Sequence, residues 1–130
     1  MNRLLGLVIM LALGGALLSA CGGSGGSSDS GPPPTPTSDL NLRAKDLKFD
    51  KKALAVPAGA QVTLTFDNED PGAQHNFALY QDKSAKKSIF KSDLTSGKNA
   101  KDLTFMAPAA GTYFFRCDAH PDMNGTFYVH

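Results

Sequence analysis

From about residue 39 onward, apolar and polar residues alternate in short runs that are typical of half-buried β-strands. Val62, Leu64 and Phe66 alternate with threonines, and side chains two apart along a strand lie on the same face. Turn-forming residues separate further runs of this kind at 47–56, 75–80, 103–105, 113–117 and 126–130. Because no long helical period interrupts these runs, the pattern predicts an all-β domain folded as a sandwich or barrel.

Three local features of the pattern lead to specific expectations. The polar stretch 81–101 carries six lysines and is expected to form a loop, with one helical turn around residues 84–90. Leu47 and Phe49 are expected to begin a strand together. Asn124-Gly125, a dipeptide that favours tight turns, is expected to form the turn that leads into the last strand.

The N-terminal region has a different composition. Arg3 precedes the apolar stretch 4–18, which has the length of a signal-peptide core and is too short for a comfortable membrane span. The following Leu18-Ser19-Ala20-Cys21 resembles the lipobox of bacterial lipoproteins, which implies cleavage before Cys21 and lipidation of its thiol. The alternative is a plain secretory leader that is cut after small residues and carries no lipid.

The composition fits one domain with these appendages. We expect a lipoprotein signal peptide at 1–20, a lipidated cysteine with a Gly/Ser and Pro/Thr linker at 21–38, and the folded domain at 39–130. Hydrophobic residues make up 42% of the chain and charged residues 19%, which is ordinary for a globular protein. A net charge of +1 without a Lys/Arg run argues against a nucleic-acid partner.

Cys117 is the most informative residue for chemistry. If Cys21 carries a lipid, Cys117 has no disulfide partner, and a lone exposed thiol outside the cell would be oxidised unless buried or bound to metal. Cys117 continues the apolar face of the aromatic strand 113–115, so its thiol should point inward. His120 and Met123 follow within six residues, and a thiolate, an imidazole and a thioether this close together suit a copper ion.

His75 is the fourth candidate ligand. It begins a strand in which it shares a face with Phe77 and Leu79, so its imidazole is expected to point inward. An inward histidine alone is more often a hydrogen-bonded core residue than a ligand, because each buried ring nitrogen needs only a partner. Together with the three candidates near the C-terminus, His75 is better interpreted as a metal ligand.

Two segments carry a family resemblance. NEDPGAQHNFALY at 68–80 resembles the first-histidine region of the cupredoxins, the small blue copper proteins, and GTYFFRCDAHPDMNGTFYV at 111–129 resembles their ligand loop. The short Cys-x-x-His-x-x-Met loop, with a proline directly after the histidine, is similar to that of amicyanin. Plastocyanins, which are otherwise similar, and azurins have longer loops.

This resemblance implies an eight-stranded Greek-key sandwich with one type 1 copper ion. It implies that His75, Cys117 and His120 form a trigonal set and that Met123 is a long axial contact. It also implies that Asn76 braces the ligand loop by hydrogen bonding.

The expected function is that of a membrane-anchored mononuclear blue copper protein that carries single electrons between redox partners, such as a cytochrome. We expect a monomer, lipid-anchored on the outer face of the cytoplasmic membrane or in the periplasm. We do not expect an enzyme, because Met123 leaves no open position for a substrate. Two alternatives remain open: a copper carrier or storage protein, and a metal-free sandwich for adhesion or structure.

Residues around the expected site allow two interpretations. The nearby carboxylates either ring the metal end and steer a cationic partner or form a solvated rim; they are Asp67, Glu69, Asp70, Asp118 and Asp122. The lysines of 83–101 either meet an acidic partner or keep the domain soluble. His130 is expected to be exposed, and Met106, on the parity opposite to Phe105, is expected to be a packing residue and not a ligand.

Overall fold

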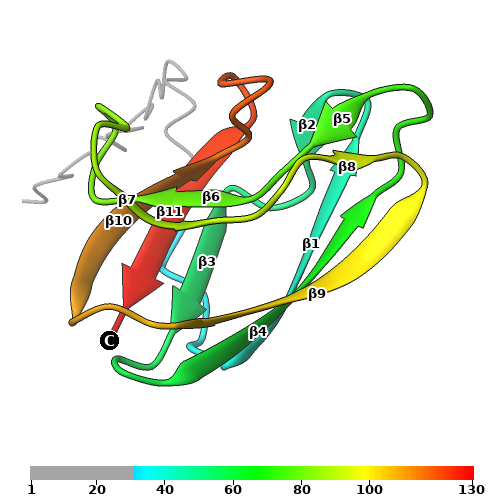
Figure 1. Ribbon diagram of the computed structural model, residues 1–130. Helices are drawn as coiled ribbons and strands as arrows, with labels where there is room; N and C mark the ends of the chain where they lie inside the picture. Colours follow the sequence, from blue (N-terminus) through cyan, green and yellow to red (C-terminus); the bar gives the residue numbers. More distant parts are fainter. Residues whose placement is uncertain (1–30) are drawn as a thin grey trace, which may run out of the picture. The chain divides into compact units, whose positions relative to one another are not determined.

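The computed structural model describes residues 31–130 (Figure 1), and the regular secondary structure of this part consists of β-strands. The expected leader at 1–20 and the expected lipidation site Cys21 lie outside the described residues. Among residues 31–130, none belongs to a helix that is long and apolar enough to cross a membrane.

The first sheet contains four strands in the order β2-β1-β4-β9. Their bounds are Asp39–Lys45 for β1, Lys48–Phe49 for β2, Gln61–Asn68 for β4 and Asn99–Met106 for β9. β1 runs parallel to β4, with Asp39 opposite Thr63 and Ala44 opposite Asn68. β4 and β9 pair antiparallel along their whole length.

The second sheet contains five strands in the order β3-β11-β10-β6-β7. Their bounds are Ala53–Val56 for β3, Ala78–Tyr80 for β6, Ser88–Lys91 for β7, Gly111–Arg116 for β10 and Asn124–Val129 for β11. A short pair, β5 (Gln74–His75) with β8 (Thr95–Ser96), lies at the end of the sandwich where β2 also lies (Figure 1).

The non-sequential strand order means that the chain crosses between the sheets several times, as in a Greek-key sandwich. The predicted all-β sandwich is therefore confirmed. The described part has eleven strands, of which β2, β5 and β8 span only two residues. The other eight correspond to the number that the family resemblance implied.

The alternating pattern buries one face of each sheet in a common core. In β4, the side chains of Val62, Leu64 and Phe66 are all 0% exposed, as the period of two predicts. Aromatic rings fill the space between the sheets, and the Phe77 and Phe115 ring centroids lie 5.7 Å apart. This core continues directly into the candidate ligands, because Cys117 and Met123 belong to the same cluster of packed residues.

Three local expectations are wrong. Leu47 is 53% exposed, because it lies with Asp46 in the turn between β1 and β2, and both residues have positive φ. The expected helical turn around 84–90 is absent, and residues 88–91 form β7 instead. Met106 does not pack inside, since it ends β9 with 60% of its side chain exposed.

The Asn124-Gly125 pair does not form a turn either, because these residues are the first two of β11. The Asn124 side chain instead closes the preceding loop by donating to the Pro121 carbonyl at 2.9 Å. Gly125 lies against the Phe115 ring, and a Cβ added at Gly125 would lie 2.6 Å from the Lys52 carbonyl oxygen. A glycine is therefore required here by close packing.

We predict that Gly125→Ala destabilises the domain by about 1–3 kcal/mol, the usual cost of overpacking a filled core. Chemical denaturation of the metal-free protein measures this change. Gly31→Ala is the control, since no heavy atom lies within 4 Å of a Cβ at that position. An unfolding free energy of Gly125→Ala equal to that of the wild type would contradict the packing argument.

Candidate metal centre

The loop from Cys117 to Met123 is held closed at both ends. The Cys117 N–H donates to the Met123 carbonyl at 2.9 Å, and the Met123 N–H donates to the His120 carbonyl at 2.9 Å. Directly outside the loop, Arg116 of β10 pairs with Asn124 of β11. These contacts turn the chain back within a few residues and bring Cys117 and His120 to the same end of the sandwich.

His75 reaches this end from a different part of the chain. It is the last residue of β5, where it pairs with Thr95 of β8, and it is 0% exposed. The next residue but one, Phe77, is packed in the aromatic core. The backbone at His75 is therefore held by the β5–β8 pair, and the chain just after it is held by the aromatic core.

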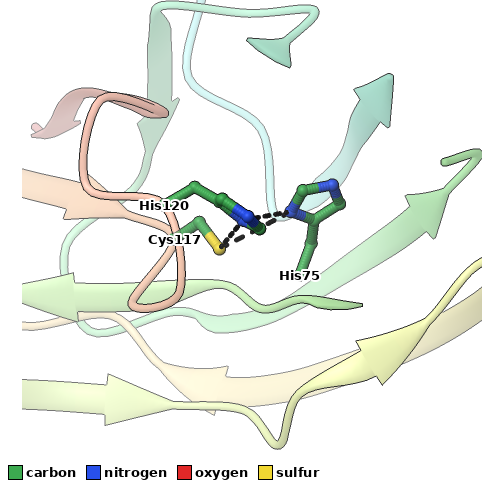
Figure 2. A group of neighbouring side chains, drawn as sticks. All are labelled: His75, Cys117 and His120. Carbon is green, nitrogen blue, oxygen red and sulfur yellow. Dashed lines mark hydrogen bonds between the residues drawn. The ribbon is translucent and has the colours of Figure 1, made fainter. Parts of the chain in front are cut away.

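His75, Cys117 and His120 converge at one point (Figure 2). Cys117 Sγ lies 3.7 Å from His75 Nδ1 and 3.9 Å from His120 Nδ1, and the two Nδ1 atoms are 3.1 Å apart. With metal bonds of about 2.0 Å to nitrogen and 2.3 Å to sulfur, donors in a trigonal plane are separated by about 3.5–3.7 Å. The observed triangle therefore fits one first-row metal ion.

Solvent reaches these side chains very unequally. Cys117 and His75 are 0% exposed and Met123 is 1% exposed, whereas His120 is half-buried. The buried thiol is shielded from oxidants, and the Met123 side chain supplies a soft sulfur within the same core cluster. This combination of thiolate, imidazole and thioether donors suits copper in both of its common oxidation states.

Asp70, one of the five carboxylates considered near the metal end, contacts a candidate ligand directly, and the sequence did not indicate this contact. Its Oδ2 atom lies 2.8 Å from His75 Nε2. Burial alone would raise the pKa of Asp70, but hydrogen bonds from the Leu47 N–H, the His75 ring and the Asp46 N–H lower the pKa below its ordinary value. The only signal in the sequence was the position of Asp70 in the turn five residues before His75.

Asn76 ties the strand that follows His75 to the ligand loop. Its side-chain oxygen accepts the Asp118 N–H at 2.8 Å, and its amide nitrogen donates to the Ser92 carbonyl at 3.1 Å. Asn76 is 3% exposed, so these bonds replace those it would make to water. The residue after Cys117 is thereby fixed to the residue after His75.

The nearby carboxylates do not form a free acidic ring. Asp118 accepts from Tyr80 at 2.6 Å and from Arg116 at 3.1 Å. Glu69 pairs with Arg43 at 2.9 Å. With Asp70 bound to His75, three of the five carboxylates are committed to internal contacts, which favours the solvated-rim interpretation over steering of a cationic partner.

The sandwich and the His-Cys-His triangle together define a β-protein built around one soft metal site. The chain belongs to the cupredoxin-like family, since its sequence matches the cupredoxin-like domain over residues 11–129. It is 32% identical to auracyanin-A of Chloroflexus aurantiacus, over 98% of this chain and 96% of that protein. The family resemblance inferred from the two sequence segments is therefore confirmed.

Solved structures of related proteins agree with this assignment. Dithionite-reduced auracyanin from Roseiflexus castenholzii has a TM-score of 0.68 at 25% identity, covering 74% of this chain and 99% of its own. Auracyanin A, described as a blue copper protein from Chloroflexus aurantiacus, has a TM-score of 0.63 at 29% identity, covering 74% and 100%.

We predict that Asp118 makes stability depend on pH. Burial raises the pKa of Asp118, but contacts with neighbouring side chains outweigh it and lower the pKa to about 2; they are Lys91, Tyr80, Asn76 and Arg116. A lowered pKa contributes stability above the unfolded-state value near 4, and this is lost as the pH falls toward 2. The contribution is about 2 kcal/mol.

Urea denaturation of the metal-free protein between about pH 6 and pH 2 measures this effect. The difference in unfolding free energy between wild type and Asp118→Asn should shrink steadily below about pH 4. A difference that stays constant across this range would show that the ionised carboxylate does not contribute.

Proposed function

We propose that this protein is a mononuclear blue copper protein that carries single electrons between redox partners in the cell envelope. The observation that carries the proposal is the triangle of His75, Cys117 and His120, with donor separations of 3.1–3.9 Å at the end of a packed core. A bound copper ion supplies the one-electron couple, since Cu(I) favours sulfur ligands and Cu(II) accepts imidazole.

Each candidate ligand has a different role at the copper ion. Cys117 provides the thiolate, and its burial and the bond from its N–H to Met123 hold the sulfur in place. His75 would be the buried anchor, while Met123 would supply a weak thioether ligand that tunes the potential. Because hydrogen bonds and core packing fix these side chains, the geometry of the site changes little between oxidation states. Fast electron transfer needs this small change in geometry.

His120 provides the route for electrons to and from a partner. It is half-buried, whereas the other three candidate ligands are 1% exposed or less. A redox protein that docks at this end of the domain therefore comes closest to the ion through the His120 ring. A cytochrome is the kind of partner that we expect, and the domain is expected to act as a monomer.

Copper handling is the main alternative, and the burial of the ligands argues against it. A carrier that passes copper on needs rapid exchange, but Cys117, His75 and Met123 lie at 0–1% exposure within the core. A catalytic copper site, which we did not expect, would need an open coordination position, and a contact from Met123 would occupy it. A relative supports an electron-transfer function, since one auracyanin was solved in a dithionite-reduced form.

The test is optical and kinetic. The copper-loaded protein should be intensely blue, lose the colour on reduction, regain it on oxidation by cytochrome c, and release copper slowly to a chelator. Cys117→Ser should abolish the blue band, because the colour arises from thiolate-to-copper charge transfer. Met106→Leu should leave the spectrum unchanged, because Met106 is 60% exposed.

Two outcomes would reject this function. A protein that stays colourless with Cu(II) and an oxidant would favour a metal-free role. A blue protein that loses copper to the chelator within seconds would favour copper handling instead.

We also propose that Cys21 carries a lipid that anchors the domain to the outer face of the cytoplasmic membrane or within the periplasm. The support is the lipobox-like Leu18-Ser19-Ala20-Cys21 after an apolar stretch. We predict that protein extracted from membranes has an intact mass equal to residues 21–130 plus a diacylglyceryl group, with or without a further acyl chain. Cys21→Ser should release the domain from membranes, and an unmodified Cys21 in the wild type would contradict the anchor.

A further inference from the structure

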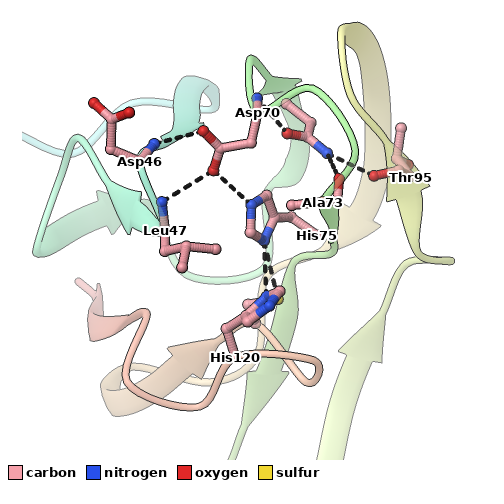
Figure 3. A network of polar contacts seen from close by, with 9 residues as sticks. Asp46, Leu47, Asp70, Ala73, His75, Thr95 and His120 are labelled. Atoms are coloured by element: carbon pink, nitrogen blue, oxygen red, sulfur yellow. Dashed lines mark hydrogen bonds and ion pairs between the residues drawn. The ribbon is translucent and has the colours of Figure 1, made fainter.

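The tautomer of His75 is determined by what its outer ring nitrogen contacts. His75 Nε2 lies 2.8 Å from Asp70 Oδ2 (Figure 3), and the histidine is 0% exposed. A carboxylate accepts hydrogen bonds and does not donate, so Nε2 carries the ring proton. The Nδ1 lone pair is thereby left free on the side that faces Cys117 and His120.

Asp70 is itself held by donors from a distant turn. One carboxylate oxygen accepts the backbone N–H of Asp46, and the other accepts the N–H of Leu47 at 3.0 Å as well as the His75 proton. The Asp70 N–H donates to Asn68 Oδ1 at 2.9 Å. Three donors thus converge on two carboxylate oxygens, a demand that an ionised carboxylate meets and a neutral amide does not.

Asn68 extends this support into the first sheet. It ends β4, is 0% exposed, and donates from its amide to the Ala73 carbonyl at 2.9 Å and to the Thr95 carbonyl at 2.7 Å. Thr95 is the residue paired with His75 across β5 and β8. The Asp70 carboxylate and the His75 backbone are therefore held by one connected set of hydrogen bonds.

We propose that Asp70 is a positioning residue of the copper site, a proposal that rests on the function proposed above. It holds His75 in the tautomer that offers Nδ1 to the ion, and it places one negative charge directly behind the imidazole. A hydrogen-bonded carboxylate makes a histidine ligand more basic, and a negative charge stabilises a divalent ion more than a monovalent one. Asp70 therefore lowers the reduction potential and tightens copper binding.

A purely structural role has to be distinguished, because Asp70 also anchors the turn at 46–47. Asp50 offers a matched control. Its carboxylate accepts the Arg43 N–H at 2.8 Å and pairs with Lys51 at 2.9 Å, so it too ties β1 to the segment after β2, without a hydrogen bond to a candidate ligand. Asp50→Asn makes the same carboxylate-to-amide change beside a similar backbone donor and leaves His75 untouched.

The experiment compares full-length, copper-loaded wild type with Asp70→Asn and Asp50→Asn. Asp70→Asn should have a higher reduction potential and about 10- to 100-fold weaker copper affinity, as measured by redox titration and chelator competition. Asp50→Asn should keep the wild-type potential and affinity, even where its unfolding free energy is lower. An Asp70→Asn protein with reduced stability but wild-type potential and affinity would overturn the proposal.

A second measurement needs neither copper nor a variant. Nitrogen-15 NMR of the metal-free wild type should show His75 protonated at Nε2 and unprotonated at Nδ1. A proton on Nδ1 would overturn the proposal, and this result decides it even where Asp70→Asn does not fold. If the wild type binds copper but exchanges no electrons, the proposed function fails while copper affinity and NMR still test Asp70.

Discussion

The structure depends on holding three electron-pair donors together at the end of a packed core, where two of them are closed to water and His120 is half-buried. The Sγ atom of Cys117 and the Nδ1 atoms of His75 and His120 lie within 3.9 Å of one another. Unless an ion or a proton lies between them their lone pairs repel, and the burial of Cys117 and His75 removes the solvent that would screen them. The scaffold must therefore fix each donor from behind, and the hydrogen bonds of the ligand loop, Asn76 and Asp70 do this from three parts of the chain.

Features of the fold that arise from local patterning could be predicted from the sequence. The alternation in β4 identified Val62, Leu64 and Phe66 as core residues, because the period of a strand fixes which side chains share a face. Cys117 and His120 could be placed together because a short loop separates them. His75 could be added only through its inward position at a strand start and its combination with the three candidates near the C-terminus.

The features that the sequence did not reveal depend on long-range contacts. Gly125 was interpreted as a turn residue, but the ring of Phe115 and a carbonyl of Lys52 decide its role. Leu47 was placed in a strand because it is apolar, whereas its turn is held by a carboxylate 23 residues further along the chain. Asp70 was considered only as one of five carboxylates near the metal end, because nothing near it in sequence shows that it contacts His75 and the turn at 46–47.

The register of β1 against β4 separates the two ends of the domain. Asp39, the first residue of β1, lies opposite Thr63, and Ala44 lies opposite Asn68, two residues before Asp70. At about 3.3 Å per residue, the start of β1 is a strand's length away from the ligands. Before β1, however, the Thr37 N–H donates to the Ala55 carbonyl at 3.0 Å, and Pro34 lines one groove with Lys51 and Ala53. Ala53 pairs with Thr126 near the start of β11, so residues 34–37 lie along β3 and lead back toward the end that carries the ligand loop. A tether joined to this segment would therefore leave the domain along the outer edge of the second sheet and not at the pole farthest from His120.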